Sequence, residues 1–324
     1  MIALHTATPC AALRRFVRVY AEREVTSFLS GPGCVKELVP ARLEQTLEFQ
    51  LGLPFTVHLP DRHLTTPEQV IVGAYVNAAA QIELWPGTKS FAVFFVPTGF
   101  SQLFGIPVSE MSQRNYDAAM VVGVTRALRE HLGACTSFEQ RVRVIEDALL
   151  PLAACARKRP LMTAVAEHVF VRRGMIDSVE RLAADAGLGI RQFERLFLRE
   201  IGISPKLYAR VARFQNALDM KIAAPQRTWL EIAHRLRYHD QMHMIRDFQL
   251  LGGNTPGQLL SQIGDGRPGA VGTGDDEEEY FARRRVFTRP SEARSAKLCS
   301  VADCQPQRST VRLFFPEGDA LGDS

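Results

Sequence analysis

Basic side chains recur along one face of the segment that spans residues 190–201. Arg191, Arg195 and Arg199 are spaced by four residues, so in a helix they project from the same outer face. A guanidinium group donates two hydrogen bonds to the O6 and N7 atoms of guanine, and it also binds phosphate. Arg191 and Arg195 are therefore candidates to contact base edges of DNA, with phosphate contact as the alternative, and Arg199 is a candidate to contact the phosphate backbone.

A second set of outward positions follows residue 240, on a helix whose inward positions are Met244, Phe248 and Leu251. The members of this set are Gln241, Met242, His243 and Arg246. The side-chain amide of Gln241 has the geometry that pairs with N6 and N7 of adenine. The two sets together predict double-stranded DNA as a partner, and each good pair contributes about 1–3 kcal/mol of discrimination between bases.

The elements around the first set have the order helix, turn, helix. Asp177 and Glu180 have the spacing of a capping box and predict a helix start, because negative charge favours a helix N-terminus. Gly187 and Gly189 then permit a tight turn. Apolar residues occupy the inward positions of the two helices: Val179, Leu182, Ala183 and Ala186 in the first, and Phe193, Leu196, Phe197 and Ile201 in the second. This order is the helix-turn-helix pattern.

The pattern then occurs a second time. Thr228 and Glu231 make a capping box, and Asp240 precedes a helix that Gly252 and Gly253 close. The inner face of the short first helix consists of Trp229, Ile232, Ala233 and Leu236. Two helix-turn-helix units are therefore predicted in one all-α domain.

A long helix joins the two units. Pro205 is tolerated in its first turn, and a single apolar stripe then continues to Ala224 and Pro225. At 1.5 Å per residue the helix is roughly 27 Å long, which suits two reading heads near the repeat of about 34 Å between successive major grooves. We expect its basic residues to contact phosphate and to add affinity that does not depend on sequence. These residues are Lys206, Arg210 and Arg213.

The segment from about Thr163 to Ile263 resembles the DNA-binding domain of the AraC/XylS family of transcriptional regulators. The matching runs are VERLA at 179–183, FERLF at 193–197, GISPK at 202–206, EIA at 231–233, IRDF at 245–248 and TP at 255–256, together with Tyr208, Asp240 and Gln241. The resemblance implies that the second helix of each unit enters a major groove. It places base reading on Arg191, Glu194 and Arg195 in the first unit, and on Gln241, Met242, His243 and Arg246 in the second.

The resemblance also implies RNA polymerase as a partner and a homodimer as a candidate assembly, and it implies no cofactor. We assign Gln192 to the phosphate backbone together with Arg199, Lys206, Arg210 and Arg213. Two positions depart from the family pattern, because Gly189 stands where a capping serine is usual and Arg237 stands where the second turn has glycine. A positive φ at Arg237 would cost of order 1 kcal/mol. We therefore expect the first unit to supply most of the sequence discrimination. Leu259 stands where an aromatic residue is frequent and should still pack.

The N-terminal part has the pattern of a β-rich domain. Short apolar runs between residues 18 and 96 alternate with Gly and Pro turns, and residues 91–96 predict a buried strand that ends at Pro97. A short helical insertion is expected to start at Gln102–Phe104, and residues 117–170 have a helical period. The predicted class is α+β. Its parts are a β-rich, cupin-like sensor or dimerisation domain (1–115), a helical connector (116–160), the DNA-binding domain (161–263) and a disordered acidic tail (264–324).

The chemistry of the N-terminal domain is less defined by sequence. Tyr75, Trp85 and Phe94 are candidates to line an apolar pocket for a small-molecule effector, although aromatic residues on strands are more often core. His58 and His63 lack the HxH spacing of a cupin metal site, and the six cysteines lack zinc spacing, so no metal site is expected.

Motifs for catalysis and export are also missing from the sequence. There is no phosphate loop, no GxSxG elbow and no run of about 20 apolar residues. We expect a cytoplasmic, nucleoid-associated protein that does not act on a membrane and is not an enzyme.

Three hypotheses for the function of this protein are compatible with the sequence. The first is a DNA-binding regulator that responds to a small molecule through its N-terminal domain. The second is a regulator controlled by a protein partner or by its own oligomerisation. The third is a β-domain enzyme fused to a DNA anchor, which would need a metal that copurifies with the chain.

Overall fold

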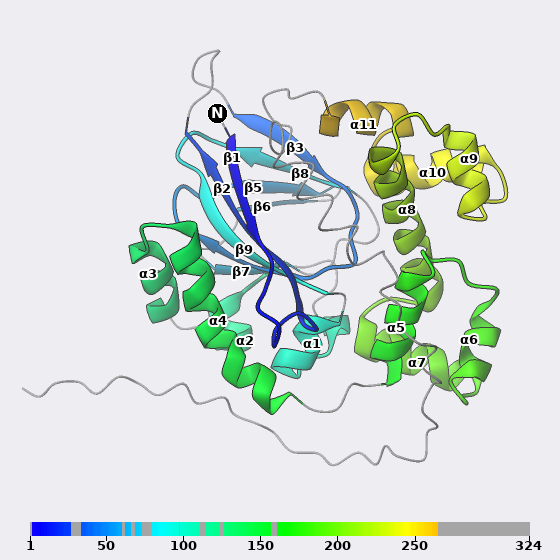
Figure 1. Cartoon of the computed structure of the whole chain (residues 1–324), viewed down its shortest axis with the longest axis horizontal. Coiled ribbons are helices and arrows are strands. Elements are labelled where there is room, and N and C mark those ends of the chain that lie inside the picture. The colour runs from blue at the N-terminus through cyan, green and yellow to red at the C-terminus, as the bar shows by residue number, and fades with distance from the viewer. Residues whose placement is uncertain are drawn as a thin grey trace, which may run out of the picture.

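The computed structural model of the chain describes residues 2–26, 34–59, 62–65, 69–72, 79–96, 98–110, 115–123, 126–156 and 161–264. The described strands lie in the N-terminal part, and the C-terminal part consists of helices that pack beside it (Figure 1). The predicted α+β class is therefore confirmed. Beyond Gly264, the segment expected to be a disordered tail lies outside the described residues.

Two antiparallel sheets form the β-rich half of the molecule. The larger has the order β1 (Ile2–Ala7), β2 (Val17–Val25), β9 (Lys89–Phe95), β4 (Thr46–Gln50), β7 (Gln69–Val72) and β10 (Asn115–Asp117). The smaller has the order β3 (Val35–Val39), β8 (Ala80–Leu84), β5 (Thr56–Leu59) and β6 (Arg62–Thr65). Most strands are short, so the sheets depend on packing against other elements for their stability.

The larger sheet buries one face against helices. Side chains alternate along each strand, and Phe91, Val93 and Phe95 of β9 share the buried face with Leu47 and Phe49 of β4. The predicted buried strand at residues 91–96 is thus confirmed. Helices α1 (Gly99–Phe104) and α4 (Phe138–Cys155) supply apolar side chains to the same core.

Helix α1 begins at Gly99, not at Gln102, so the predicted start of the helical insertion was three residues late. The reason is the close approach of the Gly99 backbone to the backbone of Phe16, which the helical spacing of apolar residues does not reveal. A Cβ atom added to Gly99 would lie 1.8 Å from the carbonyl oxygen of Phe16. Glycine here therefore allows the helix to start directly against the loop before β2.

The segment expected as a connector contains helices that belong to the core of the β-rich half. These are α2 (Ala118–Val122), α3 (Arg126–Ala134) and α4. Leu132, Ile145 and Leu149 are buried in one cluster with the phenylalanines of β9. The basic stretch expected at the domain boundary, residues 157–160, lies outside the described residues, so the exact boundary stays a prediction.

Seven helices make up the described C-terminal half, and they surround one apolar core. They are α5 (Leu161–Val171), α6 (Val179–Asp185), α7 (Ile190–Ile201), α8 (Pro205–Ala223), α9 (Trp229–Arg235), α10 (Gln241–Gly252) and α11 (Pro256–Gly264). Phe193, Phe197, Phe214 and Phe248 are fully buried in this core. Leu259 is also fully buried, as expected. Among the described residues, no helix has both the length and the apolar character needed to cross a membrane.

A short segment between β3 and β4 joins the two halves. The side chains of Ala41 and Leu43 are buried in the core of the helical half, and the backbone N–H of Ala41 donates to the carbonyl of Leu251 at 2.7 Å. Glu44, which follows Leu43, accepts hydrogen bonds from Arg18 at 2.6 Å and from Gln215 of α8 at 3.2 Å. Because the side chains of Arg18 and Glu44 are only 6% and 2% exposed, this ion pair is shielded from water.

We expect Glu44→Ala to lower the free energy of unfolding by about 3–5 kcal/mol, because it leaves the Arg18 guanidinium buried without its carboxylate. Urea denaturation followed by circular dichroism measures this loss. As a matched control, Glu130→Ala removes the carboxylate of the exposed Arg126–Glu130 pair and should cost less than about 0.5 kcal/mol. Similar losses in the two variants would mean that the buried pair contributes no more stability than the exposed one.

Candidate nucleic-acid interface

The first helix-turn-helix unit consists of α6, a turn and α7. Helix α6 is capped by Ser178, whose Oγ accepts from the N–H of Arg181 at 3.1 Å. The predicted cap, Asp177, was therefore wrong by one residue, because a cap must directly precede the first helical residue and Val179 holds that place. The Glu180 carboxylate accepts hydrogen bonds from the backbone N–H of Glu180 and from the Ser178 hydroxyl, and both hydrogen bonds lower the pKa of Glu180.

The turn of the first unit uses glycine where the backbone requires it. Gly187 has a φ of 68°, which favours glycine, and Gly189 is the N-cap of α7 with an extended backbone. Since glycine has no side chain, it cannot accept a hydrogen bond from the first turn of α7. The departure noted in the sequence therefore leaves α7 without a side-chain cap.

Helix α7 separates its apolar and polar residues cleanly. Phe193, Phe197 and Ile201 face the core, as predicted. The residues expected to contact DNA are all exposed on this helix: Arg191, Gln192, Glu194, Arg195 and Arg199. Arg199 forms an exposed ion pair with its neighbour Glu200 at 3.2 Å. The helix thus presents the side chains that the sequence predicts for a reading head.

Helix α8 places its predicted phosphate contacts in different environments. Lys206 is exposed near the start of the helix, after the cap residue Ser204. Arg210 pairs with the buried Asp247 of α10 at 2.6 Å. Arg213 donates to the carbonyl of Gly174 at 3.2 Å and lies 5.3 Å from the ring centroid of Tyr238. Both arginines therefore join elements within the domain, and their phosphate contacts stay a prediction.

Sequence reasoning missed Asp247, although a signal was present. Asp247 lies beside the inward-facing residues Met244 and Phe248 of α10 and is buried with them. A buried acidic residue needs a partner. Its pairing with Arg210 holds α10 against α8. Burial is the main cause that raises the pKa of the neighbouring Tyr238, and the charge of Asp247 adds to it.

The second unit has the two caps that the sequence predicts. The hydroxyl of Thr228 accepts from the N–H of Glu231 at 3.2 Å, and the Glu231 carboxylate accepts from the N–H of Thr228 at 2.8 Å. Asp240 caps α10 by accepting from the N–H of His243 at 2.7 Å, which lowers the pKa of Asp240. The four predicted reading residues of this helix are exposed: Gln241, Met242, His243 and Arg246.

Arg237 has the left-handed backbone that its position predicts, with a φ of 54°. Its guanidinium lies 3.3 Å from the carboxylate of Asp177, which precedes the first unit. Both side chains are about two-thirds exposed, at 66% and 69%, so this pair adds little stability. Arg173 also has a positive φ, of 58°, which the sequence gave no reason to expect.

The predicted effector residues of the N-terminal half lie in different environments. Trp85 is 44% exposed in the turn before β9. Phe94 is half-buried on β9, and the guanidinium carbons of Arg18 and Arg42 lie 5.8 Å and 5.4 Å from its ring centroid. Tyr75 lies outside the described residues. A pocket built from all three therefore stays a prediction.

His58 and His63, the weak metal candidates of the sequence, face each other across β5 and β6. Their Nδ1 atoms are 2.7 Å apart, and Nε2 of His58 lies 3.2 Å from the carboxylate of Glu83. The hairpin register makes them direct partners, which their spacing of five residues does not reveal. The contact is a hydrogen bond between two imidazoles.

Comparison with known proteins agrees with this geometry. A family model described as a helix-turn-helix domain matches residues 182–262, from α6 to α11. The C-terminal half is therefore an AraC-type helix-turn-helix domain, as the sequence resemblance implied. No curated protein matches the sequence.

Several solved structures match this chain at low sequence identity and low TM-score. ToxT from Vibrio cholerae O395 is 6% identical over 81% of this chain and 97% of that chain, with a TM-score of 0.42. ToxT from Vibrio cholerae strain SCE256 with a bound unsaturated fatty acid is 7% identical, over 81% and 95%, with a TM-score of 0.41. The AraC-like transcriptional activator CuxR is 13% identical, over 66% and 86%, with a TM-score of 0.27.

We expect Arg237→Gly to stabilise the protein by about 0.5–1 kcal/mol. Glycine removes the strain of about 1–2 kcal/mol at a positive φ, and its greater freedom in the unfolded chain offsets part of that gain. The equivalent turn of the first unit supplies the control, because Gly187→Ala should destabilise the protein by a similar amount. Thermal unfolding measures both, and a lower Tm for Arg237→Gly would show that the turn is not strained.

Proposed function

We propose that this protein is a sequence-specific DNA-binding regulator of transcription that uses α7 and α10 as recognition helices. The observation that carries the proposal is the matched geometry of the two units. Each places a helix with one apolar face in a shared core and leaves the predicted reading residues exposed. Helix α8 fixes the two units in one body, which suits contact with successive major grooves.

The first unit carries most of the sequence reading in this proposal. Arg191, Glu194 and Arg195 offer two guanidinium donors and one carboxylate acceptor on the exposed face of α7. In α10, Arg246 and Gln241 offer comparable groups, but Met242 can make only apolar contacts. Gln192, Arg199 and Lys206 would hold the protein on the phosphate backbone.

We expect Arg191→Ala and Arg195→Ala to weaken binding to a selected DNA site by about 5- to 100-fold each, because each removes a base contact of about 1–3 kcal/mol. Binding to random duplex should change much less. Fluorescence anisotropy with both duplexes measures the two affinities, after selection of the site from a random DNA library.

Arg143→Ala is the matched control, because it removes an exposed arginine from α4 in the other half of the chain. It should leave both affinities unchanged. If the recognition-helix variants lose both affinities equally, their arginines contact phosphate and not bases. An affinity that does not fall with salt concentration would contradict DNA binding itself.

Regulation through the N-terminal half is the second part of the proposal. That half touches all three helices that position the reading heads. Ser109 donates to the carbonyl of Arg199 at the end of α7, Glu44 accepts from Gln215 of α8, and Ala41 donates to Leu251 of α10. A ligand that shifts these contacts would change the placement of both recognition helices.

The face of the larger sheet that lies opposite the helices is where we propose that a small polar effector binds. Thr46, Glu48 and Gln50 alternate with the apolar core residues of β4 and share this face with Phe94 and Ser90. Gln50 is only 2% exposed, yet within the described part of the chain neither of its amide atoms has a hydrogen-bond partner. Burial without partners is unfavourable by about 1–3 kcal/mol per group, so a bound polar molecule would offset a real cost.

A panel of metabolites tested by thermal shift should contain a polar compound that raises the Tm of the protein but not of Gln50→Leu. The control is Gln81→Leu, which changes an exposed glutamine on β8 and should respond like the unchanged protein. A compound that acts equally on Gln50→Leu would place the effector elsewhere. If a thorough panel contains no such compound, control by a protein partner or by oligomerisation replaces the small-molecule effector as the proposed means of regulation.

RNA polymerase, a homodimer and a place in the nucleoid remain parts of the proposal that follow from the role of a regulator. The enzyme hypothesis would require a metal that copurifies at one per chain and is bound by the β-rich half.

A further inference from the structure

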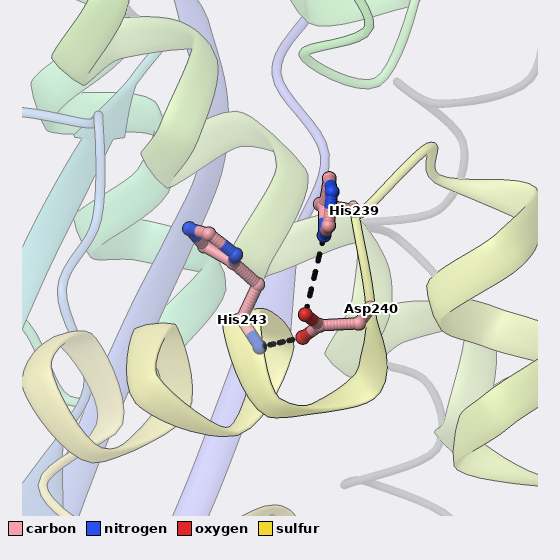
Figure 2. Close-up of side chains that lie close together, drawn as sticks. All are labelled: His239, Asp240 and His243. Carbon is pink, nitrogen blue, oxygen red and sulfur yellow. Dashed lines mark hydrogen bonds and ion pairs between the residues drawn. The ribbon is translucent and has the colours of Figure 1, made fainter.

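Two histidines and an aspartate gather at the start of the second recognition helix. His239 and Asp240 directly precede α10, and His243 lies in its first turn (Figure 2). One potential ligand atom from each residue lies within 4.8 Å of those of the other two. All three residues are exposed, so a solvated ion has direct access to them.

The separations within this cluster suit a metal ion with short bonds to nitrogen and oxygen. Two ligands at about 2.0–2.1 Å from a tetrahedral metal lie about 3.3 Å apart. The Nδ1 atom of His239 and the Oδ2 atom of Asp240 are 3.2 Å apart. The imidazole of His243 is exposed, and the centroid of its ring lies 6.0 Å from that of His239.

The cap of α10 uses one carboxylate oxygen of Asp240 and leaves the other beside His239. Asp240 uses Oδ1 to accept from the N–H of His243, and its other oxygen, Oδ2, points toward His239. The cap therefore fixes the orientation of the carboxylate before any ion arrives. A fixed carboxylate lowers the entropy that binding must remove.

We propose that His239, Asp240 and His243 bind one divalent transition-metal ion, such as Zn²⁺ or Ni²⁺. Imidazole nitrogens bind Zn²⁺ and Ni²⁺ better than they bind Mg²⁺ or Ca²⁺, so two imidazoles and one carboxylate select for a transition metal. Water completes the coordination on the exposed side. The spacing of these ligands, i, i+1 and i+4 around a helix start, matches neither the cysteine spacing of zinc sites nor the HxH pair of a cupin, so the sequence did not reveal the site.

The site has a consequence for DNA binding that rests on the proposed function. His243 is one of the predicted reading residues of α10, and an imidazole nitrogen that coordinates a metal cannot also bond a base. Metal and specific DNA should therefore weaken each other's binding by the same factor.

Isothermal titration of the full chain, first stripped with EDTA, with ZnCl₂ in the absence of DNA tests the site directly. We expect one high-affinity ion per chain. Loss of an outer-shell partner alone typically weakens metal binding by about 10- to 100-fold, so the loss of a ligand in His239→Gln should weaken it by at least about tenfold. Asp240→Asn should do the same, and its asparagine still caps the helix.

Two controls separate this site from other histidines. His234→Gln removes an exposed histidine of the preceding helix α9, and His63→Gln removes the imidazole pair on β5 and β6. Both should bind zinc like the unchanged protein. Retained affinity in His239→Gln, or a lost site in His63→Gln, would overturn the proposal.

A second titration in the presence of the selected DNA site tests the consequence. Zinc should bind more weakly there than in free protein. Conversely, ZnCl₂ should weaken binding of the selected DNA site, and this effect should disappear in His239→Gln, which loses a metal ligand but keeps the predicted reading residue His243. Because the first titration contains no DNA, failure of the metal site and failure of the DNA-binding proposal give different results.

Discussion

Glu44 lies where the β-rich half and the helical half of the chain meet. A carboxylate taken out of water is costly unless charged and polar groups replace its hydration. Glu44 finds one such group on each side, because Arg18 belongs to β2 and Gln215 belongs to α8. Burial, together with the charge of Glu44, raises the pKa of the neighbouring Tyr208 on α8. The hydrogen bond from Gln215 to this carboxylate joins the two halves.

This docking places the N-terminal half against α7 and α10, the helices proposed to read DNA. The contacts at Arg199 and Leu251 lie toward the C-terminal ends of α7 and α10, away from the first turns that hold Arg191 and Gln241. A Cβ atom on Gly253, just after α10, would lie 3.3 Å from Ala79 and 3.4 Å from Leu38 of the β-rich half. The N-terminal half therefore touches the C-terminal ends of α7 and α10, and the first turns of both helices stay exposed.

Several local features could be predicted from sequence because their causes lie within a few residues. The capping box of Thr228 and Glu231 and the apolar face of α7 follow from spacing and residue type. The positive φ of Arg237 was expected from the family resemblance, because the AraC/XylS pattern has glycine at this turn. Errors arose where two adjacent residues could fill the same role, as with Asp177 and Ser178. The early start of α1 was hidden because it depends on Phe16, which is remote in sequence from Gly99.

The sequence by itself determined the two helix-turn-helix units, their order and the residues on their exposed faces, because helical period and capping act over one or two turns. The tertiary structure alone decided that helices α2 to α4 complete the core of the β-rich half, and that Arg210 and Arg213 make contacts within the domain. It also decided that Glu44 meets Gln215, which is 171 residues further along the chain. Partners at such a distance leave no trace in local periodicity. Their identity is fixed only when burial forces each polar group to find a neighbour.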